Sequence, residues 1–284
     1  MSPLTPFSAA QLDATLARLG LPAERPAPTL ANLDRLIVAS LHRLPFENLD
    51  VVLDKPVEIE PEAVFAKVVE RHRGGYCFEL NSLFGRLLAS LDYRVTLLVA
   101  RVRWGLPSDA PLTPQTHLLL RVDLDEGPHL VDIGFGGPAS PRALPLQLDE
   151  ELPGGWRITP DAGGELEMAT RSASGWQTLY RFTLEPQHWA DYGMRNWYTS
   201  TYPQSVFRNS LRVALSEEGA RLSLLNGQFS RRGADGGIQQ RSIEDADELL
   251  TVLRERFRLQ VAESETAALR ARLARLLLET RSLV

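Results

Sequence analysis

A change of hydrophobic pattern near residue 92 constrains the fold more than any other feature of the sequence. Before this point, leucines recur at the three- and four-residue spacing of amphipathic helices. Four such runs begin at or just after residues typical of helix starts, namely Ser8, Thr29, Pro61 and the pair Gly74-Gly75. After it, short β-branched runs bounded by turn residues predict strands. Because helices and strands are segregated along the chain, we predict an α+β fold.

The predicted strands lie in the middle of the chain and again near its end. They are expected at residues 94–102, 117–124, 129–133, 166–170, 176–184, 211–215 and 221–225. A glycine-rich hairpin turn at 233–237 follows the last of them. Two helices then close the chain, and a capping box at Ser242–Asp245 is expected to begin the first.

Charge and composition exclude several classes of function. Lys and Arg number 31 against 36 Asp and Glu, a net charge of −5, which makes nucleic acid a poor partner. No segment approaches the roughly 20 apolar residues of a membrane span, and the first residues lack a signal-peptide pattern. A single cysteine excludes a disulfide framework, and the dispersed histidines give no metal-ligand spacing. We expect a cytoplasmic monomer or homodimer that binds neither nucleic acid nor membrane.

The single cysteine, Cys77, follows a Gly74-Gly75 turn and stands at or near the start of a predicted helix. At that position the helix dipole and unpaired N–H groups favour a thiolate. The same N–H groups could form part of an oxyanion hole for an acyl intermediate. Most free cysteines, however, are small buried apolar residues. The local pattern alone leaves the two interpretations evenly balanced.

A thiolate nucleophile needs a base, and the base needs an orienting group. Among the five histidines, His117 is distinctive because it begins an apolar strand, and Asp132 lies among apolar residues of the next strand. Across a two-residue turn at Asp125-Glu126 they would be diagonal neighbours on one face, about 7–8 Å apart at the backbone. A three-residue turn would separate them. A structural His–Asp bond is the competing interpretation, but together with Cys77 a catalytic triad is the better account. His129 is expected to be exposed at the start of its strand.

With these residues in view, the sequence resembles the arylamine N-acetyltransferase family. Several short segments carry the resemblance, in the order that the family has them. They are Leu44–Leu49 (LPFENL), Arg73–Asn81 (RGGYCFELN), His117–Leu120 (HLLL), Val131–Gly136 (VDIGFG), and Asn196–Tyr198 with Ser205–Phe207. The likeness covers most of residues 30–215 and fades in the C-terminal third.

The resemblance implies a papain-like core made of three domains. A helical domain over residues 1–92 would carry the cysteine, a β-barrel domain over 93–203 the histidine and aspartate, and an α/β lid would span 204–284. It also implies ping-pong acyl transfer, as in xenobiotic metabolism, with acetyl-CoA as co-substrate and no bound cofactor or metal. Cys77 would take the acetyl group as a thioester, paired with His117 and supported by Asp132. An arylamine, hydrazine or similar amine would then accept it.

The same matches extend to residues that would contact the substrates. The acceptor pocket would be lined by Phe135, Val102 and Phe46. The coenzyme would be met by Tyr198 and by the loop residues Pro114, Gln115 and Thr116. Pro114 and Gln115 depart from the small residues that some relatives have there, and the aromatic positions could instead be core packing.

Other functions remain open at this point. An amide synthase of the same family, which closes a macrolactam from a carrier-bound acyl chain, would use the same triad. No basic patch that could receive an acidic carrier is visible in the sequence, so this alternative has less weight. A thiol hydrolase or peptidase is permitted by the triad alone, whereas a ligand-binding protein without turnover would not need the three residues intact.

Overall fold

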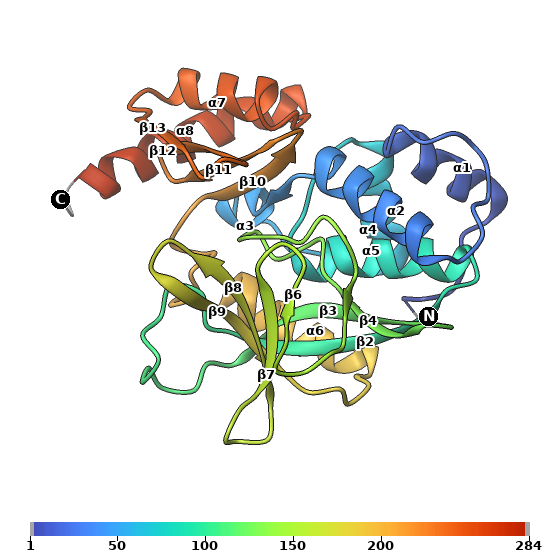
Figure 1. Ribbon diagram of the computed structural model, residues 1–284. Helices are drawn as coiled ribbons and strands as arrows, with labels where there is room; N and C mark the ends of the chain where they lie inside the picture. The colour runs from blue at the N-terminus through green and yellow to red at the C-terminus, as the bar shows by residue number, and fades with distance from the viewer. Residues whose placement is uncertain (1–2, 282–284) are drawn as a thin grey trace.

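The computed structural model describes residues 3–281 and confirms an α+β fold, with most helices near the two ends of the chain and two sheets (Figure 1). The helical elements are α1 (Ala9–Arg18), α2 (Leu30–Arg43), α3 (Leu49–Val52), α4 (Pro61–Phe65), the π-helical segment η1 (Ala66–Glu70), α5 (Cys77–Ser90), α6 (Trp189–Thr201), α7 (Ala246–Glu255) and α8 (Glu263–Arg281). No helix in this described range is long and apolar enough to cross a membrane.

The N-terminal helices begin where the sequence predicts them. Ser8 caps α1 through a capping box with Gln11, and Thr29 caps α2 by accepting a hydrogen bond from the backbone of Asn32. Pro61 is the first residue of α4. The apolar faces of α1, α2 and α5 share one core with the inner residues of the following strands. This core holds α5 and its first residue, Cys77, in a fixed position.

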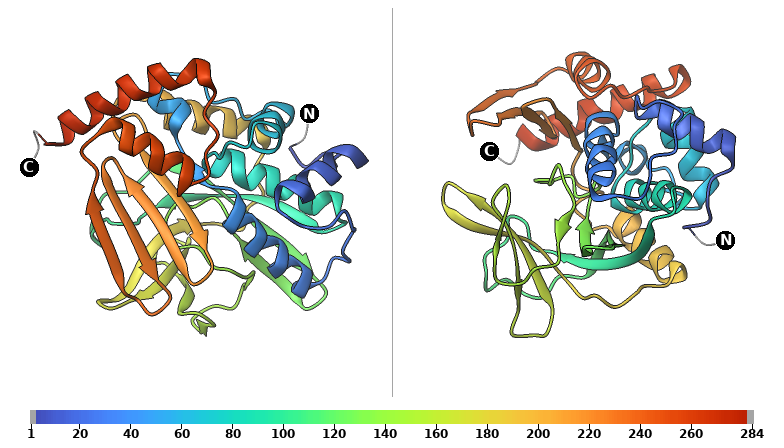
Figure 2. Two further views of the ribbon diagram at one scale, coloured as in Figure 1. Left: turned by 90° about the horizontal axis from the view of Figure 1, so that it is seen from above. Right: turned by 45° about the vertical axis from the view of Figure 1, so that its right-hand side comes forward.

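The middle of the chain forms an eight-stranded antiparallel sheet that curls into a nearly closed barrel (Figures 1 and 2). Its strands are β2 (Arg94–Val102), β3 (Gln115–Leu124), β4 (Gly127–Val131), β5 (Leu144–Pro145), β6 (Glu151–Leu152), β7 (Trp156–Pro160), β8 (Leu166–Ser172) and β9 (Gly175–Phe182). The spatial order is β5-β4-β3-β2-β9-β8-β7-β6. Helix α5 packs against β2 and β3, which brings its N-terminus to the strand that carries His117.

A second antiparallel sheet combines one early strand with four late ones. Strands β1 (Phe46–Glu47), β10 (Arg212–Glu217), β11 (Ala220–Leu225), β12 (Gln228–Gly233) and β13 (Ile238–Ser242) lie in the order β1-β10-β11-β12-β13. Helices α7 and α8 cover one face of this sheet, and their leucines share a core with α3. The C-terminal segment is therefore joined to the N-terminal helices through β1 and α3.

Two expectations from the sequence are wrong. Ser242 does not begin a helix, because it pairs with Gln228 as the last residue of β13, and α7 is instead capped by Asp245. His129 is buried rather than exposed, because β5 covers the start of β4 and pairs Pro145 with this histidine. Its Nδ1 donates a hydrogen bond to the carbonyl of Gly127.

Candidate active site

Cys77 is the first residue of α5, and the backbone before it makes a turn that needs glycine. A Cβ added to Gly74 would lie 2.0 Å from the carbonyl oxygen of Pro45, and one added to Gly75 would lie 2.7 Å from Glu79 Oε2. Only glycine tolerates such close approaches. The turn sets the sulfur at the N-terminal end of the helix, with the residue only 3% exposed. There the helix dipole favours a thiolate.

His117 reaches the cysteine because β3 contains a bulge. His117 pairs with Ala100 of β2, but the next pairing joins Arg101 to Gln115, so Thr116 is an extra residue. A bulge of this kind bends the strand and redirects its groups. The carbonyl of Thr116 accepts a hydrogen bond from Cys77 Sγ at 3.6 Å. The bulge thus ties the end of α5 to the strand that carries His117.

Asp132 follows β4 directly and lies diagonal to His117. The turn between β3 and β4 has two residues, since Leu124 pairs with Gly127 and Leu120 with Val131. This is the register that the two-residue turn predicted. The two side chains meet, with His117 Nε2 2.7 Å from Asp132 Oδ2. The second imidazole nitrogen, Nδ1, is left for the cysteine.

Asn81 joins the three segments and was missed by the sequence analysis. Its Nδ2 donates to Asp132 Oδ1 at 2.9 Å and to the carbonyl of Leu118 at 2.6 Å. Its Oδ1 accepts from the backbone of Ile133 at 3.0 Å. Asn81 stands one helical turn after Cys77 and therefore on the same face of α5, which is the signal that could have found it.

The pKa of His117 identifies the charge state of the site. Burial lowers this pKa, but the charge of Asp132, its hydrogen bond and the neighbouring Cys77 outweigh burial and raise it to about 10. His117 is then an imidazolium at neutral pH, as a thiolate–imidazolium pair requires. Tyr180 and Phe135 pack on the imidazole, with ring centroids 5.2 and 5.3 Å away. Burial and then the charge of Asp132 raise the pKa of Tyr180, which keeps its hydroxyl protonated.

This shift makes a prediction about pH. We expect the imidazole resonances of His117 to show a protonated ring at pH 8 and to titrate near pH 10 in an NMR experiment. Because the folded pKa is raised above the free value of about 6.5, the stability that it adds is complete below that pH and is lost as pH rises through about 10. A midpoint near 6.5 in the folded protein would contradict the ion pair.

Behind the Gly74-Gly75 turn that precedes Cys77 lies a buried cluster of charged residues. Lys67 Nζ is 2.6 Å from both Glu79 and Asp50, and Arg73 is 2.9 Å from Glu47 and 3.1 Å from Asp50. Burial raises the pKa of Glu79 to about 7, against the opposing charge of Lys67. Its Oε2 also accepts from the backbone of Tyr76 at 3.0 Å. The cluster therefore supports the turn that carries Cys77.

Removing the Lys67 ammonium group from this cluster should destabilise the fold. We expect Lys67→Met to lower the free energy of unfolding by about 3–5 kcal/mol, because buried Glu79 loses the lysine that pairs with it and Asp50 keeps only Arg73. The loss should be smaller at pH 5 than at pH 8, since Glu79 can then take up a proton. Urea unfolding at both pH values measures this. Lys55→Met, which removes a partly exposed pair with Glu265, should cost less than about 1 kcal/mol. Equal losses at both pH values would contradict the role of Glu79.

The three expected acceptor residues lie around the triad. Phe135 packs on His117, and Val102 at the end of β2 pairs with Tyr180. Phe46 packs on the loop after the aspartate, because a Cβ added to Gly136 would lie 2.7 Å from its ring. Phe135 therefore contacts His117 directly, whereas Val102 reaches it through Tyr180. Phe46 contacts the loop that follows Asp132.

The expected coenzyme residues are less closely grouped. Thr116 contacts Cys77 through its carbonyl, and the side chain of Gln115 accepts from Arg195 at 3.2 Å. Pro114 is exposed. Tyr198 lies on α6, where its ring stacks on Tyr202 at 4.7 Å, and no described contact joins it to the triad. The structure places Thr116 against Cys77, whereas the described contacts of Gln115 and Tyr198 are with Arg195 and Tyr202.

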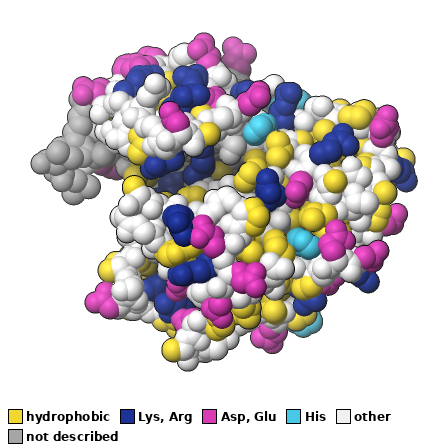
Figure 3. Space-filling view, in the orientation of Figure 1, with side chains coloured by type: hydrophobic (Ala, Val, Ile, Leu, Met, Phe, Trp, Pro, Cys, Tyr) yellow, Lys and Arg dark blue, Asp and Glu magenta, His cyan; other side chains and the backbone are white. Residues whose placement is uncertain are grey.

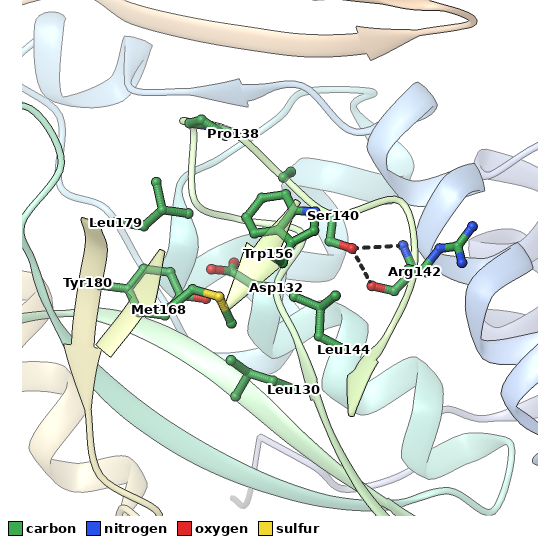
Figure 4. A pocket seen from close by; sticks show the side chains of 11 residues that line it. Leu130, Asp132, Pro138, Ser140, Arg142, Leu144, Trp156, Met168, Leu179 and Tyr180 are labelled. Carbon is green, nitrogen blue, oxygen red and sulfur yellow. Dashed lines mark hydrogen bonds between the residues drawn. The ribbon is translucent and has the colours of Figure 1, made fainter. Parts of the chain in front are cut away.

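A small hollow opens beside Asp132 on the barrel side (Figure 4). Leu130, Trp156 and Met168 contribute apolar walls, and Tyr180 lies at the same edge as the aspartate. The side chain of Asp132 is 11% exposed, against 3% for His117. Among residues 3–281 there is no group of three His, Cys, Asp or Glu side chains that could hold a metal ion.

Comparisons with known proteins gave matches over most of the chain. A family model described as N-acetyltransferase matches residues 29–266. An arylamine N-acetyltransferase of Mycobacterium tuberculosis is 41% identical over 260 residues, which cover 88% of this chain and 90% of that protein. One from Mycolicibacterium smegmatis is 37% identical over 95% of this chain and 99% of that protein. The solved structure of the Mycobacterium marinum arylamine N-acetyltransferase in complex with CoA has a TM-score of 0.88 and 35% identity, covering 93% of this chain and 99% of that one.

Proposed function

The chain belongs to the arylamine N-acetyltransferase family, and from this premise we propose that Cys77, His117 and Asp132 transfer an acetyl group from acetyl-CoA to the nitrogen of an arylamine or hydrazine. It is accordingly an acyltransferase. The observation that supports the roles of the three residues is the bond between His117 and Asp132 beside a cysteine at a helix N-terminus. A thiolate in that position is a nucleophile that needs no further activation at neutral pH.

In the first half of the reaction, the Cys77 thiolate attacks the thioester carbonyl of acetyl-CoA. The N–H groups in the first turn of α5 stabilise the oxyanion that forms. The carbon–sulfur bond to coenzyme A then breaks, and the leaving thiolate takes the proton of His117. The products of this half are free coenzyme A and an acetyl thioester on Cys77.

In the second half, the amine nitrogen attacks the acetyl thioester. Neutral His117 takes the proton from the nitrogen, and the bond between the acetyl carbon and Cys77 breaks. This restores the thiolate and the imidazolium and releases the acetylated amine. Asp132 holds the imidazole with Nδ1 toward the sulfur in both halves, since its own bond is to Nε2.

Two groups of residues are proposed to contact the substrates. Phe135, Val102 and Phe46 would receive the aryl ring, because apolar and aromatic side chains favour a flat apolar group. Pro114, Gln115, Thr116 and Tyr198 would face the coenzyme. The named partner in the Mycobacterium marinum structure, CoA, agrees with a coenzyme donor for this chain.

We also propose a role for each of the three segments of the chain. Residues 1–92 would supply the nucleophile, 93–203 the histidine and aspartate, and 204–284 a lid beside them. We further propose that the protein works in the cytoplasm as a monomer or homodimer, with acetyl-CoA as a substrate and no resident cofactor.

Intact-protein mass spectrometry tests the proposed function. Mixing with acetyl-CoA should add one acetyl group, and peptide mapping should place it on Cys77, the chain's single cysteine. Adding an aromatic amine such as aniline should discharge it to the acetylated amine. Protein first alkylated with iodoacetamide is the control and should gain nothing. A thioester that water discharges as fast as the amine does would indicate a hydrolase, and no adduct at all would overturn acetyl-CoA as the donor.

A further inference from the structure

A second small hollow, which we call the helical hollow, lies among α1, α2, η1 and α5, and no residue of the triad lines it. Three polar side chains line it, those of Thr15, Arg18 and Ser40. The Thr15 hydroxyl already donates to the carbonyl of Gln11 at 2.8 Å. Arg18 and Ser40 therefore remain available to a ligand. The other walls are apolar and come from Leu19, Leu44, Val69, Leu83, Phe84 and Leu87.

The hydroxyl of Ser40 has no hydrogen-bond partner in the helical hollow. Ser40 lies on α2 and is 0% exposed, and its Oγ makes no hydrogen bond to any residue in the range 3–281. A hydroxyl buried in this way costs free energy, and native proteins seldom leave one unpaired. An acceptor oxygen placed in the hollow would recover that free energy.

Arg18 brings a positive charge to the same hollow without a carboxylate beside it. Its Nε donates to the carbonyl of Val68 at 3.0 Å and its Nη2 to that of Arg73 at 3.4 Å. Arg18 is half-buried and pairs with no carboxylate of the described chain, whereas Arg86 on α5 pairs with Glu62 at 2.8 Å. A half-buried guanidinium without an anion is unfavourable, and a bound anion would remove the penalty.

Two further arginines add positive charge beside Arg18. Burial, and then the charges of Arg43 and Arg258, lower the pKa of Arg18 to about 10. Arg43 packs on the turn after α1, since a Cβ added to Gly20 would lie 3.1 Å from its Nη2. Arg258, between α7 and α8, donates to the carbonyl of His42 at 3.3 Å. Figure 3 shows Lys and Arg side chains over the N-terminal helices and where these meet the C-terminal part.

We propose that the helical hollow binds a short-chain monocarboxylate, with its carboxylate between Arg18 and Ser40 and its alkyl group on the apolar walls. Guanidinium N–H groups and a hydroxyl are donors that a carboxylate accepts. The alkyl group suits the leucine, valine and phenylalanine walls, whereas a phosphate dianion would lose more hydration and gain fewer apolar contacts there. The site is separate from acyl transfer, so it does not rest on the proposed function.

Calorimetric titration and thermal unfolding with sodium propionate test the site, with sodium chloride at equal ionic strength as the baseline. Propionate at about ten times its dissociation constant should raise the melting temperature of the wild type by about 3 °C. The dissociation constant should rise roughly tenfold in Arg18→Gln and roughly threefold in Arg43→Gln. The matched control is Arg35→Gln, because Arg35 is exposed on α2 and bonds only to Asn32. It should bind like the wild type.

Ser40→Ala should change stability and binding in opposite directions. Without propionate its melting temperature should rise by about 1–3 °C, because the variant removes an unpaired buried hydroxyl and gains helix propensity. Its dissociation constant for propionate should nevertheless rise roughly fivefold. A side chain that only supported the fold would lower the melting temperature when it is removed.

Alkylation with iodoacetamide separates the helical hollow from the active site. Protein alkylated at Cys77 should bind propionate as tightly as untreated protein. Loss of binding on alkylation would place the carboxylate at the triad and overturn the proposal. Inorganic phosphate binding as tightly as propionate would also overturn it, as would no propionate binding at all, which is expected if the hollow holds only water. If Arg18→Gln does not fold, exposed Arg43 carries the test, and an unchanged dissociation constant in Arg43→Gln and Ser40→Ala would overturn the proposal.

Discussion

Cys77→Ala is expected to lower the rate of acetyl transfer by about 10⁴- to 10⁶-fold while leaving the fold intact. The change removes the atom that becomes acylated, and no other thiol exists in the chain to replace it. The residue is buried at the start of α5, so alanine fills most of its space and keeps helix propensity. Turnover of aniline with acetyl-CoA, followed by chromatography, measures the loss.

Separate measurements check that Cys77→Ala still folds. Circular dichroism and the melting temperature should stay close to the wild type, because alanine keeps the helix and the sulfur loses only its contacts with the carbonyl of Thr116 and with His117. Cys77→Ser is a second comparison. It replaces the thiol with a hydroxyl of similar size, which is a poorer nucleophile without a strong base. Turnover by Cys77→Ala above a hundredth of the wild-type rate would remove the nucleophile assignment.

Asp132→Asn should reduce kcat by about 10⁴-fold while the protein stays folded. Asp132 Oδ1 accepts from Asn81 and from the backbone of Gly134, so this position must remain an oxygen in the variant. The amide nitrogen then faces His117 Nε2, which must become an acceptor. The imidazole proton moves to Nδ1, where a proton prevents the ring from taking one from sulfur or amine.

Two measurements distinguish this effect from simple loss of structure. The midpoint of the His117 titration should fall from about 10, because the charge of Asp132 raises that pKa. Acylation of Cys77 should also slow, because the sulfur loses its imidazolium partner. Asp123→Asn is the matched control, since that carboxylate pairs with Arg121 at a partly exposed position. Near-normal kcat in Asp132→Asn would contradict the triad.

Much of the fold could be predicted because its strands have clear hydrophobic patterns. The range 94–102 is predicted and observed alike, since a β-branched run in the middle of a sheet leaves few alternatives. Strands β5 and β6 have two residues each and carry no pattern to detect. Helix α6 was missed because its inward side chains are Tyr192, Asn196 and Thr199 rather than leucines.

Prediction of the site from the sequence was limited in the same way. Cys77, His117 and Asp132 could be proposed from the sequence because local motifs and a two-residue turn position them. Lys67 could not, because a lysine in a helical run normally faces solvent, whereas the π-helical turn of η1 buries this one. Arg212, Arg221 and Arg232 of the C-terminal sheet stand 9 and 11 residues apart in the sequence. Only strand pairing places them on one surface, so no basic patch was visible there.

The pairing of Phe46 with Ala214 has a consequence for how the protein is made. During synthesis, β1 leaves the ribosome long before β10, by roughly 10–30 s at ordinary elongation rates. Throughout that interval β1 has an unpaired edge, and Leu49 and Val52 of α3 have no core to enter. We expect the nascent chain to depend on chaperones during this period, and the turn before Cys77 to become ordered only after the last strands emerge.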